Sequence, residues 1–230
     1  MKKLVVVNGG VSDPSTTRIL AERIADSVVA QVSKRGEGLE VEYVDLRQLA
    51  SSLATVMSTG VYDEKLRKAL DTVSAADGLI AATPVFAASY SGLFKMFFDA
   101  LDKDALTSMP VVVAATAGTA RHSLVLDYAM RPLFSYLRAT VMPTAVFAAT
   151  DDFGADADGA EMQQRTVRAA RELAEYLVDI RSAVVGFGPD FAAESGEGSG
   201  GVAHRRSTNT RVDNNVRDFA SLLQGHDGSA

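Results

Sequence analysis

Residues 78–101 read GLIAATPVFAASYSGLFKMFFDAL, and this stretch decides the fold class. Its first five residues form an apolar run short enough to be a buried strand, and its last nine carry a phenylalanine-rich helical pattern. The junction between them holds a proline, small side chains, two aromatics and a glycine, with almost no charge. A strand that passes straight into a helix in this way is typical of a parallel α/β domain.

Four further apolar runs alternate with helical patterns along the chain: LVVV (4–7), LEVEYVDL (39–46), VVVAAT (111–116) and AVFAAT (145–150). Most of these runs are continuous, as expected of strands buried on both faces, whereas the run at 39–46 alternates and is expected at an edge. Strand and helix alternation favours parallel pairing with right-handed crossovers. The sequence therefore predicts a flavodoxin-like, doubly wound, five-stranded parallel sheet of order 2-1-3-4-5 with helices on both faces.

The helices between the strands are marked by apolar spacing and by their ends. Apolar residues recur at helical spacing over 19–32, and two glycines follow that helix. Asp63 is expected to begin another helix, while the Ser- and Thr-rich segment 51–62 is expected to be a flexible or interface loop. Pro132 lies inside the helical run 123–137 and predicts a kink or break there.

The helix that closes the core is predicted to begin at Asp158, with Glu161 completing a capping box, and to run to about Val185. Beyond it the chain becomes rich in glycine and turn residues. We therefore expect residues 1–185 to form one domain, and residues 186–230 to form a C-terminal extension made of a linker and a terminal helix.

Composition excludes several classes of protein. The chain has 230 residues, 47% hydrophobic and 23% charged, which is typical of a globular domain. A net charge of −6 disfavours nucleic acid as a partner. The absence of cysteine excludes disulfides, thiolate nucleophiles and cysteine-ligated metals, no metal site is predicted, and a cytoplasmic location is favoured. The N-terminal apolar run is too short for a signal peptide or a membrane span.

In an open parallel sheet, ligands bind at the loops beyond the carboxyl ends of the strands. The first such loop, NGGVSDPSTTR (8–18), has two glycines followed by hydroxyl side chains at the start of a helix. Glycines let the backbone close on a ligand, and the free N–H groups of a first helical turn attract an anion. The loop matches neither dinucleotide-binding nor Walker spacing, so a monophosphate is favoured; a capped helix after a polar turn would use the same residues.

The second loop follows the strand at 78–82. Pro84 fixes its own φ, and the small side chains of Ala87, Ala88 and Ser89 let the backbone approach a flat ligand closely. A planar heterocycle can be recognised there by main-chain groups, although a routine strand-to-helix turn would look similar.

The third loop, ATAGTARHS (115–123), is again small, contains glycine and directly follows a strand. It also holds Arg121 and His122, which could meet a phosphate or have a structural role. Taken together, the three loops predict a site for a phosphorylated planar cofactor, with FMN the natural candidate. No G-x-S-x-G or H-E-x-x-H motif is present, and no catalytic side chain is predicted, which fits an enzyme whose hydride chemistry is carried by a cofactor.

Two blocks, ADGLIAATPVFAASYSGLFKMFFDAL (76–101) and ATAGTARHSLVLDYAMRPLFSYL (115–137), closely resemble the NAD(P)H-dependent FMN reductases of two-component flavin monooxygenase systems. The resemblance spans roughly residues 1 to 150 and includes the sulfonate-utilisation reductases and a branch paired with luciferase-like monooxygenases. It implies an enzyme that reduces FMN with NAD(P)H and passes reduced flavin to a partner monooxygenase. It also implies a homodimer or homotetramer, because this family packs the phenylalanine-rich helix between subunits.

The resemblance also implies which residues bind the cofactor. Those in the first loop would hold the phosphate, those in the second would line the flavin ring, and those in the third would lie at its pyrimidine side: Gly10, Ser12, Ser15, Thr16 and Thr17; Pro84, Val85, Phe86 and Ala87; Thr116, Ala117, Gly118, Thr119, Arg121 and His122. Tyr90 matches an extra tyrosine that the two-component subgroup carries in its fourth helix, in a π-type insertion at a subunit interface.

Gly10 and Ser12 depart from the family, which usually carries a serine and an arginine at these positions. The departure removes a positive charge from the phosphate site and suggests weaker retention of FMN. Three alternatives stay open: a reductase of quinones or azo compounds that keeps its flavin, a flavodoxin-like electron carrier, and a flavin-free relative. The sequence does not choose between NADH and NADPH.

Overall fold

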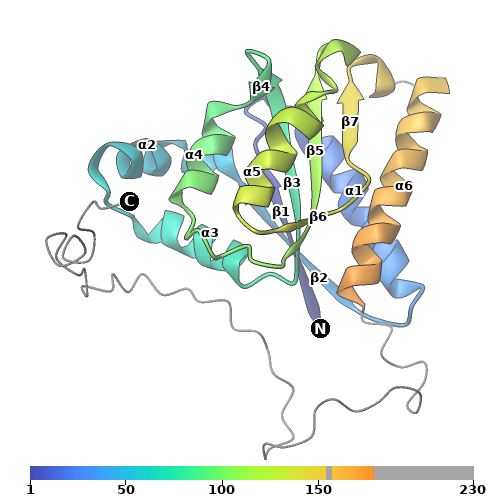
Figure 1. The fold of residues 1–230 in the computed structure, drawn as a ribbon, viewed down its shortest axis with the longest axis horizontal. Helices are drawn as coiled ribbons and strands as arrows, with labels where there is room; N and C mark the ends of the chain where they lie inside the picture. The colour runs from blue at the N-terminus through green and yellow to red at the C-terminus, as the bar shows by residue number, and fades with distance from the viewer. Residues whose placement is uncertain (154–156, 179–230) are drawn as a thin grey trace, which may run out of the picture.

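The computed structural model describes residues 1–153 and 157–178 (Figure 1). Its sheet runs in the order β2 (Leu39–Asp45), β1 (Lys2–Asn8), β3 (Gly78–Phe86), β5 (Pro110–Ala117) and β6 (Thr140–Val141). β7 (Val146–Ala149) also pairs with β5, and β4 (Ser89–Tyr90) pairs with the end of β3. All pairs are parallel except β3 with β4.

The predicted order 2-1-3-4-5 is confirmed, with the last strand in two pieces. β6 pairs with the beginning of β5 and β7 with its end, so together they form one interrupted edge. Pro143 lies in the interruption and has no N–H to donate to a ladder. The opposite edge is β2, as its alternating sequence predicted.

Helices cover both faces of the sheet (Figure 1). One face carries α1 (Thr16–Ser33) and α6 (Ala157–Leu177), packed on Leu4 and Val6 of β1. The other carries α2 (Ala50–Thr59), α3 (Glu64–Ser74), α4 (Gly92–Ala100) and α5 (Arg131–Tyr136), packed on Val5 and Val7. Alternate residues of one strand thus serve two separate cores, as the pleat of a strand requires.

Four short helices complete the described elements: the 3₁₀ turns η1 (Leu46–Leu49), η2 (Ala120–His122) and η4 (Asp151–Phe153), and the π-helical turn η3 (Leu126–Met130). Pro132 lies in the first turn of α5, and the π-helical turn η3 comes directly before that helix, so the helical run continues through this proline with its regular α-helical pattern interrupted just ahead of it. Asp63 caps α3, as predicted, because its carboxylate accepts the Leu66 N–H at 2.8 Å.

The loop predicted over 51–62 is wrong, because most of it forms α2. Leu53 and Val56 lie three residues apart and bury their side chains in the core despite their Ser- and Thr-rich surroundings. Gly60 ends the helix with a φ of 72°, and its N–H donates to the Val56 carbonyl at 2.9 Å. A left-handed glycine is a common helix terminator.

The phenylalanines of α4 fill the core on their side of the sheet. Phe94, Phe97 and Phe98 are buried, and the ring of Phe98 lies 4.7 Å from that of Phe94 and 4.9 Å from that of Phe134 in α5. Leu93 and Met96, on the same helix, are only partly buried.

α6 begins one residue before the predicted start at Asp158, and the predicted stretch from 179 to Val185 lies outside the described residues. The linker and terminal helix predicted for residues 186–230 lie outside them as well. None of the helices described, in 1–153 and 157–178, is long and apolar enough to cross a membrane.

Candidate functional site

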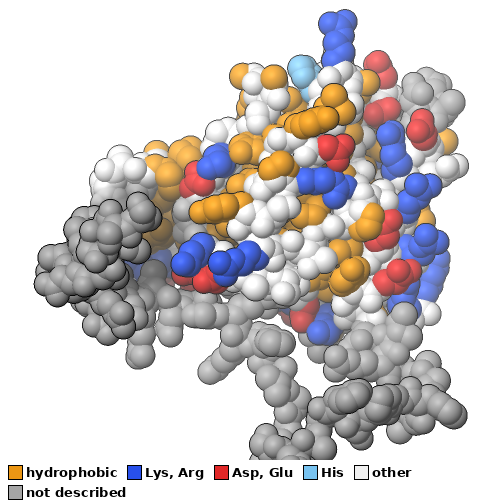
Figure 2. Space-filling view, in the orientation of Figure 1, with side chains coloured by type: hydrophobic (Ala, Val, Ile, Leu, Met, Phe, Trp, Pro, Cys, Tyr) orange, Lys and Arg blue, Asp and Glu red, His pale blue; other side chains and the backbone are white. Residues whose placement is uncertain are grey.

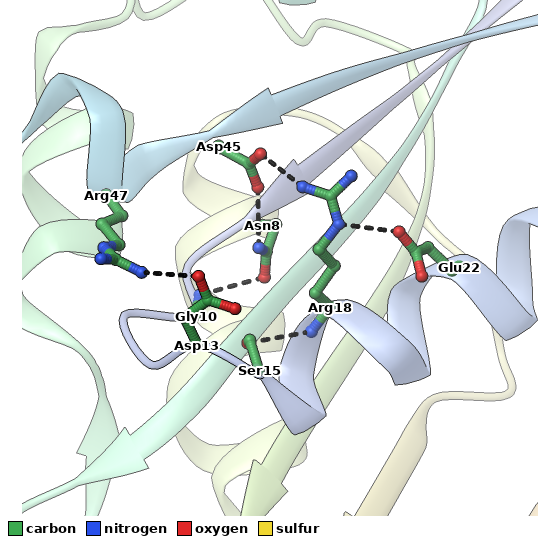
Figure 3. Close-up of polar contacts among 8 residues, drawn as sticks. All are labelled: Asn8, Gly10, Asp13, Ser15, Arg18, Glu22, Asp45 and Arg47. Carbon is green, nitrogen blue, oxygen red and sulfur yellow. Dashed lines mark hydrogen bonds and ion pairs between the residues drawn. The ribbon is translucent and has the colours of Figure 1, made fainter.

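The loop after β1 is anchored to two neighbouring strands. The Gly9 N–H donates to the Ala82 carbonyl of β3 at 2.7 Å. Asn8 accepts the Gly10 N–H on its Oδ1 at 3.0 Å and donates from its Nδ2 to Asp45, at the end of β2, at 2.9 Å (Figure 3). The loop is therefore held at the carboxyl edge of the sheet before any ligand is present.

Ser15 closes the same loop onto α1. Its buried hydroxyl is the N-cap of the helix and accepts the Arg18 N–H at 3.2 Å. A Cβ added at Gly10 would lie 2.1 Å from that hydroxyl, so glycine at this position leaves the space that Ser15 occupies. The N–H groups of Thr16 and Thr17, in the first turn, have no acceptor within the described residues. Free N–H groups at a helix start can bind an anion, so the prediction of an anion position here stays a prediction.

Arg18, the cation closest in sequence to this position, is engaged elsewhere. Its guanidinium donates to Asp45 at 2.6 Å and to Glu22 at 2.7 Å, and lies over the ring of Tyr43 (Figure 3). The hydrogen bond to Glu22 and the charge of Asp45 raise the pKa of Arg18. Arg47 lies 4.0 Å from Asp13 across the loop. An anion at the start of α1 would thus be held by N–H and hydroxyl groups rather than by a free charge.

The second loop is a hairpin at the tip of β3. Val85 pairs with Tyr90 and Phe86 with Ser89, which leaves Ala87 and Ala88 as a two-residue turn. Their φ angles are 47° and 67°, so both alanines adopt the left-handed conformation typical of a type I′ turn. Phe86 is half exposed beside them.

Thr83 joins this hairpin to α4. Its buried Oγ1 accepts the Ser91 N–H at 3.1 Å, and the hydroxyl of Ser91 in turn caps α4 by accepting the Phe94 N–H. Ser91 is almost fully buried. The small polar residues on either side of the hairpin therefore fix how the strand enters the helix.

The helical placement of Tyr90 is wrong, because this residue lies in β4, ahead of α4, and α4 contains no π-helical turn. The π-helical turn of the described residues is η3, and its tyrosine is Tyr128, which is 79% exposed. The tyrosine that lies in a π-helical turn is therefore Tyr128 and not Tyr90. Tyr128 lies in the block 115–137 that carries the resemblance, but no local pattern in that block distinguishes a π-helical turn.

The third loop begins at the end of β5, beside the first and second loops. Thr116 pairs with Pro84 of β3, and its Oγ1 lies 2.7 Å from that of Thr17 in α1. Both threonines are buried. Beyond Ala117 the chain becomes exposed through η2, where the side chains of Arg121 and His122 reach solvent.

The structure thus brings the three predicted segments to one edge of the sheet, although their residues are presented differently. Thr17 faces inward to Thr116, whereas Ser12 and Thr16 are exposed. Pro84 and Val85 are partly buried. The sequence analysis missed Asn8, Asp45 and Thr83, the residues that hold the loops in place; an asparagine directly before Gly-Gly was the one available signal.

Three cavities are lined mainly by residues outside the three loops. One of about 440 Å³ lies along α6, and the others, about 190 and 150 Å³, adjoin α3. Neither Gly9 nor Gly10 lines any of these cavities, and no residue of the hairpin or of η2 does. Size alone does not locate a site, and ligands of open parallel sheets bind beyond the carboxyl ends of the strands, where the three loops lie. Within 1–153 and 157–178, no three His, Cys, Asp or Glu side chains gather as metal ligands would.

The arrangement fits FMN. It offers one anion position at the start of α1, and beside it a nearly uncharged platform whose backbone can approach a flat ring. A phosphate at the helix and a planar heterocycle along the ends of β3 and β5 match the shape of a flavin mononucleotide.

Comparison with known proteins gives consistent findings. Residues 2–154 match the family model described as NADPH-dependent FMN reductase. The FMN reductase (NADPH) of Pseudomonas aeruginosa is 36% identical over 182 residues, covering 78% of this chain and 94% of the relative. The NADH-dependent FMN reductase SfnE of Pseudomonas putida is 34% identical over 189 residues, covering 82% and 94%.

Two solved structures extend the comparison. An oxidoreductase from Corynebacterium diphtheriae is 57% identical, with a TM-score of 0.75, and the match covers 77% of this chain and 97% of that one. The apo form of the NADH:FMN oxidoreductase EmoB is 29% identical, with a TM-score of 0.63, over 74% and 89%.

Proposed function

The chain belongs to the NADPH-dependent FMN reductase family and is an NAD(P)H:FMN oxidoreductase, and from this premise we propose that it uses FMN as an exchangeable substrate. The reduced flavin would then leave for a partner monooxygenase, a luciferase-like enzyme by the resemblance noted above. Relatives named SfnE and SfnF are NADH-dependent FMN reductases of Pseudomonas.

The observation that carries the proposal concerns Arg18, the cation closest in sequence to the anion position. Its charge is already paired with two carboxylates. Arg18 is held by Asp45 and Glu22, so the FMN phosphate would be bound by the N–H groups of Thr16 and Thr17 and by neighbouring hydroxyls. A charged donor strengthens a hydrogen bond to phosphate about twofold. A site without one favours release of the flavin after each turnover.

The residues of the chain would bind and orient the reactants. We propose that Gly10, Ser15, Thr16 and Thr17 hold the phosphate, that Pro84 to Ala87 lie along the ring, and that Thr116 to Thr119 lie at its pyrimidine edge. Bound FMN supplies the ring that accepts the hydride. The hydrogen bonds made by the buried side chains of Asn8 and Thr83 would keep these loops in position while flavin enters and leaves.

The test is steady-state oxidation of NADPH and NADH by dialysed protein, first without flavin and then across an FMN titration. We expect a negligible rate without FMN and saturation as it is added. Cytochrome c, which accepts electrons from free reduced flavin, should be reduced only when FMN is present. A protein that stays yellow through dialysis and oxidises NAD(P)H only with a quinone or azo dye would contradict exchange, and support the flavin-retaining alternative.

We also propose that the chain forms a homodimer or homotetramer through the face of α4, η3 and α5. Figure 2 shows hydrophobic side chains over this face, and Leu124, Tyr128 and Tyr136 on it are 60–79% exposed. Light scattering after gel filtration would measure the mass. A monomer at micromolar concentration would contradict this assembly.

A further inference from the structure

Arg121 is an exposed cation without a partner at the edge where the flavin loops meet. It lies in η2 beside His122, which is also exposed, and neither side chain has an ion pair or hydrogen bond within the described residues. The other arginines of this edge are engaged, Arg18 by Asp45 and Glu22 and Arg47 by Asp13. Arg131, after η3, is paired with Asp127.

In the proposed orientation of FMN, Arg121 of η2 lies on the side of the ring rather than of the phosphate. The anion position lies at the start of α1, whereas η2 begins three residues after β5, beyond Thr116 and its neighbour Pro84. FMN has a single phosphate, and the proposed orientation directs it to α1 and the uncharged ring toward β5. In that orientation, a cation in η2 would lie near a part of FMN that has no phosphate.

The second substrate carries more phosphate. NADH and NADPH both contain a pyrophosphate, and NADPH has a further phosphate on its ribose. The chain has a net charge of −6, which opposes the approach of such an anion unless a local cation offsets it. Arginine suits this role because its planar group can donate two parallel hydrogen bonds to one phosphate.

We propose that Arg121, assisted by His122, binds a phosphate group of the nicotinamide dinucleotide while its nicotinamide lies over the flavin. This proposal rests on the proposed function. Contact with the ribose phosphate would make Arg121 a specificity-determining residue that selects NADPH, whereas contact with the pyrophosphate would serve both dinucleotides.

The experiment compares wild type with Arg121→Ala, Arg121→Lys and His122→Gln, and uses Arg168→Ala, an exposed arginine of α6, as the matched control. Calorimetry with FMN-free protein measures the dissociation constants of NADP⁺ and NAD⁺, and kinetics measures KM for NADPH, NADH and FMN. Because Arg121 is exposed, the variants should keep the wild-type melting temperature.

We expect Arg121→Ala to weaken NADP⁺ binding by about tenfold to a hundredfold, the range of a charge-assisted hydrogen bond. Arg121→Lys should lie in between, and His122→Gln should give a smaller loss. An unchanged NAD⁺ constant assigns the ribose phosphate, whereas equal losses assign the pyrophosphate. KM for FMN should stay at its wild-type value.

Two results overturn the proposal. One is unchanged binding of both dinucleotides by Arg121→Ala, and the other is a rise in the FMN KM alone, which would place Arg121 at the flavin. Wild-type protein that neither binds nor oxidises either dinucleotide would instead overturn the proposed function, and this inference with it.

Discussion

The hydroxyls of Thr17 and Thr116 lie 2.7 Å apart in the buried angle between the start of α1 and the end of β5. This hydrogen bond joins the helix proposed to bind phosphate to the strand whose loop is proposed to meet the ring. The protein itself therefore connects the proposed phosphate position to the proposed ring position through one hydrogen bond.

Thr17→Val should destabilise the protein by about 1–3 kcal/mol, because it leaves the Thr116 hydroxyl buried without its partner. Thr116→Val should do the same, and the double variant should recover most of the loss, since both polar groups are then removed. Urea unfolding without flavin measures all four proteins. Additive losses in the double variant would show that the two hydroxyls are not coupled.

Gly10→Ala should displace the Ser15 hydroxyl, which lies where the new Cβ would be placed. We expect a loss of about 0.5–2 kcal/mol in unfolding free energy, the usual cost of losing a helix cap, together with a raised KM for FMN. Gly92→Ala is the control, because its Cβ would meet nothing within 4 Å. If Gly10→Ala resembled Gly92→Ala in both measurements, the loop would not depend on this contact.

Replacing Ala87 and Ala88 by Asn and Gly should stabilise the protein. Both alanines have a positive φ, which costs roughly 1–2 kcal/mol for a residue with a Cβ, and Asn-Gly is the preferred pair in such turns. We expect a gain of about 1 kcal/mol by urea unfolding. Ala54→Gly, in the exposed part of α2, should lose about the same amount. A gain at Ala54, or none in the hairpin, would contradict this explanation.

Asp63 should make stability depend on pH. A hydrogen bond from Ser52 is the main cause that lowers the pKa of Asp63, followed by the bond from the Leu66 N–H. Since the folded pKa lies below the unfolded value of about 3.9, its stabilisation is complete above that value and is lost as pH falls through the folded pKa.

Asp63→Ala should accordingly lower the melting temperature at pH 7, and its difference from wild type should shrink below about pH 4. Ser52→Ala should move the Asp63 pKa, measured by NMR titration, back toward its usual value. A melting difference that is the same at pH 7 and pH 3 would mean that the charge of Asp63 is not the cause.

The sheet could be predicted from the sequence because most of its strands are continuous apolar runs. In a domain of this composition, a short run such as LVVV is typical of a strand buried on both faces. α2 could not be predicted, because only Leu53 and Val56 mark its buried side and serine and threonine surround them. Its helical state depends on packing against α4, which local preference does not reveal.

The site loops were located correctly at one edge, but the direction of each side chain was not predictable. Thr16 and Thr17 look alike in sequence, and the helix start turns one outward and the other toward Thr116. The partnership of Asn8 with Asp45 joins residues that are 37 positions apart, which no local pattern encodes. The cofactor roles of these residues remain predictions.

The two separate cores on either side of the sheet have an evolutionary consequence. α1, with the proposed phosphate position, packs on one face, while α4, η3 and α5 lie on the other. Substitutions in groups that share no neighbours change stability nearly independently. A lineage can therefore exchange side chains in the core beneath α4, η3 and α5 without needing matching changes in the core beneath α1 and α6.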